Sequence, residues 1–237
     1  MTTNKAIVPI ALPGIHEKFY QYFKDITANK TNLKVLDVGA GHGALCQEMY
    51  NDGYDVAACD LFPEYFYFDK IPCKKADLTK PLPFADNSFD VIIAVEVMEH
   101  ILDHEVFFSE CNRILKPNGQ VLISTPNILS LKSRFRFLFS GFFYTFKPLE
   151  LQNNDGLQHV ASLTLDQYNY VAIRNGFTVA TVNFDKRQST SRWLLFMYPF
   201  LWLHALLKAI NPKVHNTYDL LTARILFLGF TTKKTLV

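Results

Sequence analysis

Apolar and polar positions along the chain predict a series of buried strands. Val35, Leu36 and Val38 form a short apolar stretch that ends at three closely spaced glycines, which is typical of a strand followed by a tight turn. Residues 89–95 form a near-continuous apolar run, as expected of a central parallel strand buried on both faces. The expected strands are residues 35–38, 55–60, 73–76, 89–95, 120–124, 177–184 and 223–232.

Helical spacing separates several of these strands. Phe19, Tyr20, Phe23 and Ile26 recur at intervals typical of a helix, so we expect one over residues 16–27, after an irregular arm at the start of the chain. Further helices are expected over 44–51 and 106–115. Another is expected to begin after a cap at Ser162 or Thr164 and to stop at residues 175–176. A chain of 237 residues with this alternation suits one α/β domain spanning 1–237.

The sequence VLDVGAGHGAL, residues 35–45, carries the clearest chemical signal. Gly39, Gly41 and Gly43 leave the backbone open to a ligand, and the helix that follows directs free N–H groups to the same place. A nucleotide-like ligand is therefore expected over this turn. Gly39, Gly41 and Ala44 also satisfy a loose dinucleotide pattern, so a nicotinamide-dependent Rossmann oxidoreductase is an alternative.

Two carboxylates favour a different nucleotide. Asp37 stands two residues before the first glycine, in a strand that a dehydrogenase would leave apolar. A buried acid facing a ligand needs a cation or donor, and S-adenosylmethionine has an ammonium group. Asp60 ends the next strand, where a carboxylate can accept from both ribose hydroxyls, although an acid there can also be a helix cap or a solvated residue.

The stretch from Val35 to Gly43 resembles the first motif of class I S-adenosylmethionine-dependent methyltransferases. The L-K-P-x-G sequence at 115–119 resembles a turn of the same methyltransferases. The layout H…LT…GF over 159–177 is similar to that of methyltransferases in quinone and surface-polysaccharide pathways. The resemblance implies a Rossmann-like sheet of seven mostly parallel strands, the last one antiparallel, with helices on both faces and hydrophobic insertions.

The resemblance also implies which residues contact the cofactor. An acid at the position of Asp77 contacts the adenine amino group in this family, with Leu78 flanking the ring, and a plain turn acid is the alternative reading. The residues expected to form the cofactor site are Asp37, Gly39, Ala40, Gly41, Gly43, Asp60, Leu61, Asp77, Leu78, Glu96 and Val97.

Glu96, Glu99 and His100 form the motif E-x-x-E-H after the central strand 89–95. Residues at i, i+3 and i+4 share a helical face, so the three are expected to converge, with His159 as a fourth ligand. Oxygen and nitrogen ligands suit Mg²⁺, or Zn²⁺ if nitrogen predominates. The arrangement resembles that of ubiquinone-pathway O-methyltransferases and small-RNA 2′-O-methyltransferases.

Two alternatives to a metal stay open for these residues: a metal-free acid/base pair of His100 and His159, or a structural role. A histidine removes a hydroxyl proton near neutral pH, and a metal lowers the pKa of the hydroxyl instead. Both chemical routes indicate O-methylation.

Two hydrophobic insertions are expected, over residues 128–158 and 187–222. The first contains a basic amphipathic stretch with many phenylalanines, which is typical either of a membrane-surface helix or of a lid. The second contains the 18-residue apolar run 193–210, at the lower limit for crossing a bilayer. Because the last strand must return to the same sheet, we interpret this run as an interfacial hairpin or a dimer-forming insertion.

Composition and charge limit the kinds of partner and substrate that we expect for this protein. The 24 Lys and Arg against 22 Asp and Glu give a formal charge of +2, which disfavours nucleic acid as a partner. The four cysteines lack C-x-x-C spacing and no secretory signal is evident, so a cytoplasmic enzyme is expected, with the inner membrane surface as an alternative location. The expected acceptor is a small or lipid-linked hydroxyl compound such as a quinone precursor, lipid or glycan. A homodimer and a non-catalytic, membrane-associated binding protein stay open.

Overall fold

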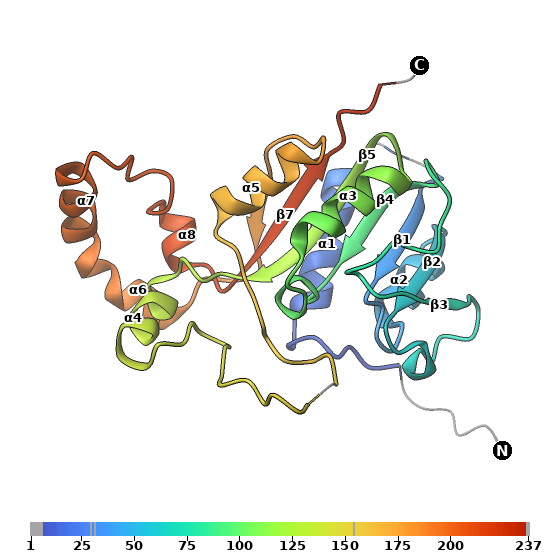
Figure 1. The fold of residues 1–237 in the computed structure, drawn as a ribbon, viewed down its shortest axis with the longest axis horizontal. Coiled ribbons are helices and arrows are strands. Elements are labelled where there is room, and N and C mark those ends of the chain that lie inside the picture. The colour runs from blue at the N-terminus through green and yellow to red at the C-terminus, as the bar shows by residue number, and fades with distance from the viewer. Residues whose placement is uncertain (1–6, 29, 31, 154, 236–237) are drawn as a thin grey trace.

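The protein folds around one seven-stranded sheet with the strand order β3-β2-β1-β4-β5-β7-β6 (Figure 1). The computed structural model describes residues 7–28, 30, 32–153 and 155–235, so the first six residues of the expected arm lie outside the described part. Strand β7 is antiparallel to both of its neighbours and all other pairs are parallel, as expected. The strands are β1 (Lys34–Val38), β2 (Asp55–Asp60), β3 (Cys73–Lys75), β4 (Phe89–Ala94), β5 (Leu115–Pro126), β6 (Thr181–Phe184) and β7 (Ile225–Thr231).

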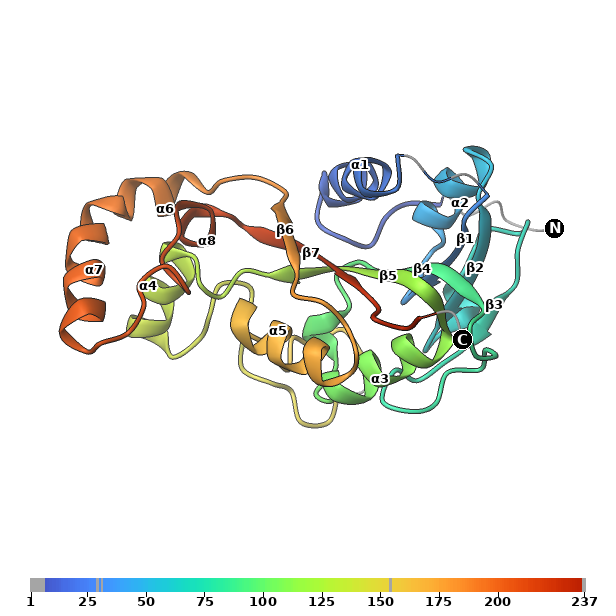
Figure 2. The same cartoon turned by 90° about the horizontal axis from the view of Figure 1, so that it is seen from above.

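Helices cover both faces of the sheet (Figure 2). On one face lie α1 (Ile15–Thr27) and α2 (Ala44–Asn51), and on the other lie α3 (His104–Ile114) and α5 (Leu165–Arg174). Each face buries its own apolar cluster, with Phe19 and Phe23 of α1 on the first and Phe107 and Phe108 of α3 on the second. Burial of these rings accounts for the helical spacing seen in the sequence.

Two strands begin four or five residues away from their expected starts, and the other strand bounds differ from expectation by at most two residues. Strand β5 begins at Leu115 rather than at residue 120, because residues 116–119 form a bulge: Leu115 pairs with Phe89, and Gln120 already pairs with Val91. Strand β6 begins at Thr181 rather than at residue 177. The stretch before β6 leaves the sheet except at one isolated bridge, where the buried Phe177 pairs with Thr232.

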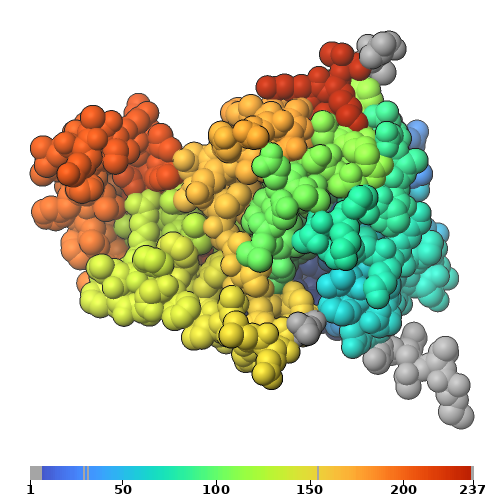
Figure 3. Space-filling model, in the orientation of Figure 1, coloured from blue at the N-terminus to red at the C-terminus, as the bar shows by residue number. Residues whose placement is uncertain are grey.

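Two stretches of the chain, one after β5 and one between β6 and β7, build a lobe at one end of the sheet, at the left of Figures 1 and 2. We call it the helical lobe. Figure 3 shows it extending beyond the body of the domain. Its own core is small and centres on Leu131, Leu194 and Leu221. The lobe contains α4 (Leu131–Ser140), α6 (Ser189–Trp193), the 3₁₀ turn η3 (Leu194–Met197), α7 (Tyr198–Leu207) and α8 (Tyr218–Thr222).

The apolar run 193–210 is not one continuous helix. Pro199, in the first turn of α7, follows the η3 turn, and α7 itself ends at Leu207. Among the described residues, every helix falls short of the length or the apolar content needed to span a membrane. This finding agrees with the expectation that the run does not cross a bilayer.

Candidate functional site

The turn between β1 and α2 uses backbone that glycine adopts without strain. Gly39 follows β1 with φ +73°, and Gly43 precedes α2 with φ +86°. A Cβ atom on Gly39 would lie 2.5 Å from Cγ2 of Val97, and one on Gly43 would lie 2.7 Å from Cε2 of Phe66. The turn is therefore closed against Val97 and Phe66, and neither glycine can be replaced without displacing a neighbour.

Asp60 holds the same turn from the carboxyl end of β2. Its Oδ2 accepts a hydrogen bond from the Gly41 N–H at 2.9 Å, and its Oδ1 accepts one from the Phe62 N–H at 2.8 Å. The N–H groups of Gly39 and Ala40 both donate to one backbone carbonyl of β2, at 2.8 and 3.2 Å. Because each carboxylate oxygen has a further lone pair, Asp60 can still accept from hydroxyls of a ligand lying on the turn.

Asp37 lies buried in β1, where its Oδ2 accepts a hydrogen bond from the Cys46 thiol of α2 at 3.1 Å. Burial raises the pKa of Asp37 to about 7, with a smaller contribution from the charge of Asp60 and an opposing one from the Cys46 bond. No Lys, Arg or His pairs with Asp37 in the part of the chain that the structure describes. A cationic ligand group would stabilise this carboxylate.

Asp77 lies just beyond β3 and makes the contacts of a turn acid. Its Oδ1 accepts from the N–H and the hydroxyl of Thr79 at 3.0 and 2.7 Å, and its Oδ2 pairs with Lys80 at 2.9 Å. The Lys80 bond, followed by the Thr79 bonds, lowers the pKa of Asp77 to about 2. Leu78 packs against the core beside it. The expected adenine contact of Asp77 and Leu78 stays a prediction.

The N-terminal arm contacts the glycine turn, which sequence reasoning missed. A Cβ atom on Gly41 would lie 2.9 Å from Cδ1 of Ile10, and the Val8 carbonyl lies 2.9 Å from Nδ1 of His42. The arm has no periodic pattern, so only the coordinates place it here. The side chain of Ile10 therefore lies directly beside Gly41 of the turn.

Glu96 departs from the expected helical arrangement. Strand β4 ends at Ala94, Glu96 has a left-handed φ of +56°, and only Met98–His100 form a single 3₁₀ turn, η2. The Glu96 N–H donates to Oγ of Ser124 at 2.7 Å, and the Ser124 hydroxyl donates to Oε1 of Glu96 at 3.1 Å. Burial raises the pKa of Glu96 to about 7, and the Ser124 bond opposes this. These bonds hold Glu96 against Ser124 of β5, so Glu96 does not share a helical face with Glu99 and His100.

Glu99, His100 and His159 form the one group of metal-ligating side chains found among the described residues, with ligand atoms within 4.8 Å of one another. Glu96 is not part of this group. Glu99 is 0% exposed, and neither of its carboxylate oxygens has a hydrogen-bond partner in the described structure. Burial, and then the nearby Glu96, raise the pKa of Glu99 well above its usual range. A carboxyl group in this position is stabilised by a proton or by a bound cation.

Backbone hydrogen bonds of the two residues that follow His159 place it beside Glu99 and His100. The N–H groups of Val160 and Ala161 donate to the Glu99 carbonyl at 2.8 and 3.2 Å. These two bonds place the segment after α4 beside η2. Residues far apart in the sequence thereby form one end of the candidate site.

The hydrogen bond of His100 fixes its protonation pattern. Its Nδ1 lies 3.0 Å from the Gln158 carbonyl, and because a carbonyl only accepts, Nδ1 carries the hydrogen. In the neutral ring Nε2 then has the free lone pair. Burial lowers the pKa of His100, and burial together with His100 lowers that of His159 to about 4. Both rings are therefore neutral at pH 7.

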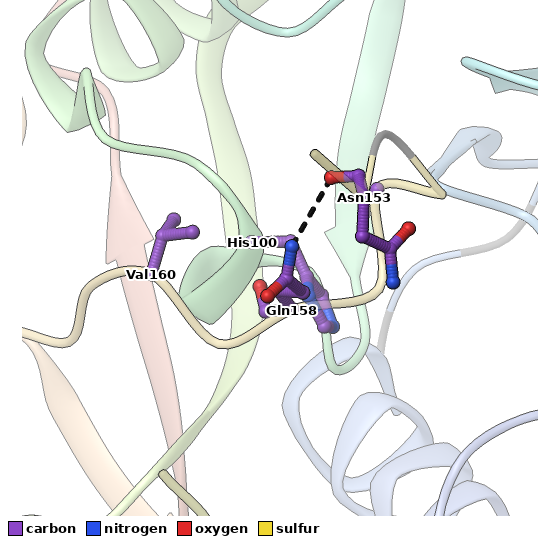
Figure 4. A pocket seen from close by; sticks show the side chains of 5 residues that line it. His100, Asn153, Gln158 and Val160 are labelled. Carbon is purple, nitrogen blue, oxygen red and sulfur yellow. Dashed lines mark hydrogen bonds between the residues drawn. The ribbon is translucent and has the colours of Figure 1, made fainter. Parts of the chain in front are cut away.

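A cavity of about 270 Å³ opens beside His100 (Figure 4). The side-chain amide of Gln158 donates to the Asn153 carbonyl at 3.1 Å and fixes the loop around it. A Cβ atom on Gly156 would lie 3.2 Å from Cε2 of Phe62, so this loop also touches the residues that follow β2. The cavity is lined by His100, Asn153, Gly156, Gln158 and Val160.

The sheet order, the antiparallel β7 and the glycine turn held by Asp60 together define an α/β protein of the class I methyltransferase fold. The chain belongs to the methyltransferase domain family, whose sequence profile matches residues 15–182. This membership favours the methyltransferase interpretation of the glycine turn over the nicotinamide-dependent one.

Individual relatives agree with this assignment. The chain is 33% identical over 156 residues to a ubiquinone biosynthesis O-methyltransferase of Pelagibacter ubique, covering 62% of this chain and 64% of that protein. The chain therefore spans less than two thirds of that relative's length. The fold is similar to a SAM-dependent methyltransferase of Archaeoglobus fulgidus, with a TM-score of 0.58, 16% identity and coverage of 92% and 94% of the two chains.

A second solved structure is similar over most of this chain. It is phosphoethanolamine N-methyltransferase 2 of Haemonchus contortus, solved in complex with S-adenosyl-L-methionine. Its TM-score is 0.56 at 18% identity, and the match covers 92% of this chain and 53% of that one. At this identity the likeness shows the shared fold.

Proposed function

We propose that this protein transfers a methyl group from S-adenosylmethionine to a hydroxyl oxygen of a small or lipid-linked acceptor. The observation that carries the proposal is the neutral pair His100 and His159 beside a cavity whose loop, through Gly156, reaches the end of β2. A neutral imidazole with a free lone pair accepts a proton near pH 7, and a hydroxyl must lose its proton when it is methylated.

The cofactor is proposed to lie over the glycine turn. Asp37 is the partner of its ammonium group, because this buried carboxylate has no cationic partner within the described chain. Asp60 accepts from the ribose hydroxyls. When bound, the cofactor supplies an electrophilic methyl group. The remaining residues proposed to enclose it are Gly39, Ala40, Gly41, Gly43, Leu61, Asp77, Leu78, Glu96 and Val97.

The acceptor is proposed to enter the cavity with its hydroxyl towards Nε2 of His100. That nitrogen takes the hydroxyl proton, while the Gln158 carbonyl holds the opposite ring nitrogen and fixes the tautomer. His159 lies edge to face with His100 at a centroid distance of 5.0 Å and keeps the ring oriented. Proximity of the deprotonated oxygen to the methyl group is the main requirement of such a transfer.

A divalent metal fits the group Glu99, His100 and His159. The fit rests on the two orphaned oxygens of Glu99, which a cation would satisfy. One carboxylate and two imidazoles favour Zn²⁺ over Mg²⁺, since Mg²⁺ prefers an all-oxygen shell. Such an ion would lower the pKa of the acceptor hydroxyl, so the metal and the metal-free base are alternative ways to one product.

The acceptor class follows from the surroundings of the site. Aromatic side chains of the segment after α4 approach His159, with the Phe146 ring 5.3 Å from it. Relatives carry the name ubiquinone biosynthesis O-methyltransferase, which supports an apolar phenol such as a quinone precursor, with lipids and glycans as further candidates. Nucleic acid is not proposed, because the formal charge is only +2.

The proposal is tested by measuring S-adenosylhomocysteine formation with the full chain. The panel contains phenols with and without a prenyl tail, lipid-linked sugars, and matched amines. We expect turnover with at least one hydroxyl compound and none with its amine counterpart. Turnover with amines alone would overturn the oxygen-acceptor assignment while keeping the methyltransferase.

A further inference from the structure

Helix α7 is apolar around its whole circumference and yet exposed. Only Ala205 among its residues is fully buried, whereas Phe200 is 70% and Leu207 75% exposed. A helix that is apolar on all sides is normally surrounded by protein or lipid. Exposed apolar side chains continue over the helical lobe, namely Phe135, Phe137, Leu138, Phe139, Trp193, Phe196, Leu203, Leu206 and Ile210.

The charged residues of the lobe segments are almost all basic. Residues 128–148 and 187–222 contain eight Lys or Arg and a single acid, Asp219, which pairs with Arg187, while the rest of the chain contains 16 Lys or Arg and 21 Asp or Glu. The formal charge of the molecule is therefore divided, with +7 on these segments and −5 elsewhere. The formal charge of the whole chain is small because acidic residues elsewhere offset the basic lobe.

Four of these cations are free to meet a partner. Lys147, Arg192, Lys208 and Lys213 are exposed, and none of them has an ion-pair partner among the described residues. Arg134, in contrast, is used inside the lobe, where it donates to Oδ1 of Asn216 at 2.8 Å and to the His215 carbonyl at 2.6 Å. The lobe is thus held together internally and still presents positive charge outside.

We infer that the helical lobe docks on an anionic lipid surface. Exposed aromatic and aliphatic side chains enter the boundary between headgroups and acyl chains, and Lys and Arg attract acidic headgroups. The positive charge of the lobe favours a lipid surface over a second copy of the chain as its partner. Two identical lobes facing each other would bring their uncompensated positive charges together, whereas an anionic bilayer neutralises them.

A row of aromatic rings leads from the lobe to the candidate site. Phe137 of α4 is 47% exposed and stacks on Phe143 with ring centroids 4.5 Å apart. Phe143 meets Phe146 at 6.4 Å, and Phe146 meets His159 at 5.3 Å. This row provides an apolar path by which a lipid-linked acceptor reaches the histidines from the membrane. This last step, unlike docking itself, rests on the proposed methyltransferase function.

The test is sedimentation of the full chain with vesicles in the absence of cofactor. We expect binding to vesicles of phosphatidylcholine with phosphatidylglycerol, weak binding to phosphatidylcholine alone, and loss of binding as salt is raised. The double variant Lys208→Glu/Lys213→Glu should bind at least about tenfold more weakly. Lys70→Glu/Lys75→Glu, with two exposed lysines outside the lobe, should bind as the parent chain does.

Apolar insertion is tested separately with Phe200→Asp/Leu207→Asp, whose side chains are exposed, against Leu102→Asp, 74% exposed and outside the lobe. Only the lobe variant should lose vesicle binding. Absence of vesicle binding by the folded parent would overturn the proposal, as would a dimer in light scattering that the lobe variant converts to a monomer. Because no cofactor is present, failure here is distinct from failure of the proposed methyl transfer.

Discussion

The imidazole rings of His100 and His159 meet edge to face, with centroids 5.0 Å apart and an interplanar angle of 79°. His100 lies in η2, which follows β4, and His159 lies in the long segment between α4 and α5. Backbone bonds to the Glu99 carbonyl and the bond from His100 to the Gln158 carbonyl hold them together. In the proposed mechanism His100 accepts the proton through its free Nε2, and His159 keeps the His100 ring oriented.

Replacing His100 by Gln should lower turnover about 10²–10⁴-fold, because the proton acceptor is lost. Affinity for S-adenosylhomocysteine should stay within about threefold of the parent value, since His100 is not part of the glycine turn. Turnover is measured on the acceptor found in the panel and affinity by calorimetry. Equal loss of both would show a structural role instead. His204→Gln, on the exposed part of α7, is the matched control.

The metal route predicts that zinc binds to the parent chain in a 1:1 ratio and more tightly than magnesium. His159→Ala and Glu99→Gln should each abolish this binding, because three ligands are the minimum for a protein zinc site of this type. Calorimetry with each metal alone and metal content by mass spectrometry give the answer, with circular dichroism as the check on folding. Tight binding that survives both substitutions would place the metal elsewhere.

Gly39→Ala should destabilise the fold by about 1–3 kcal/mol and abolish cofactor binding, since the new methyl group combines a left-handed φ with the 2.5 Å approach to Val97. Gly53→Ala has a left-handed φ too, but nothing lies within 4 Å of its Cβ, so it should cost only about 1 kcal/mol. Adding Val97→Ala should recover part of the difference. Chemical denaturation measures all four proteins, and equal costs at the two glycines would refute the steric account.

Asp37 should make the ligand-free protein less stable as pH rises. Its pKa is about 7 in the folded state against 3.8 as the reference value, so between these values the native state binds more protons than the unfolded chain. Stability is thus highest at low pH and lost through this window, by at most about 4 kcal/mol. Asp37→Asn should remove that part of the slope and raise stability at pH 8.

The same Asp37→Asn variant should lose affinity for S-adenosylhomocysteine, because the amide cannot pair with an ammonium group. A variant that is more stable but binds the ligand more weakly shows that Asp37 serves binding although it destabilises the fold. Asp69→Asn, whose side chain is 86% exposed, is the control for both measurements. A variant that binds as tightly as the parent would remove Asp37 from the cofactor site.

Local sequence was enough to predict the geometry of the glycine turn, where the cofactor is proposed to bind. The strand, the glycines and Asp60 lie within one β-turn-α-β unit, and their geometry follows from nearby residues. The seven strands and the antiparallel β7 were also predicted, and only the starts of β5 and β6 were misplaced by more than two residues. Those errors have a tertiary cause, since the β5 bulge and the Phe177 bridge depend on partner strands.

The acceptor end could not be derived in the same way. Convergence of Glu99 and His100 with His159 was expected, but on the face of a helix that includes Glu96. The left-handed backbone of Glu96 and its bonds to Ser124 redirect it, and no periodicity in the sequence encodes them. Contact of Ile10 with the glycine turn escaped prediction for the same reason: it depends on tertiary packing alone.

The central claim is that the glycine turn and Asp60 bind S-adenosylmethionine rather than a nicotinamide dinucleotide. Calorimetric titration of the purified chain with S-adenosylhomocysteine, alongside NADH and the Asp60→Asn variant, tests it most directly. The account predicts 1:1 binding of S-adenosylhomocysteine, no heat with NADH, and affinity at least about tenfold weaker in the variant. Binding of NADH, or a folded chain that binds neither ligand, would contradict it.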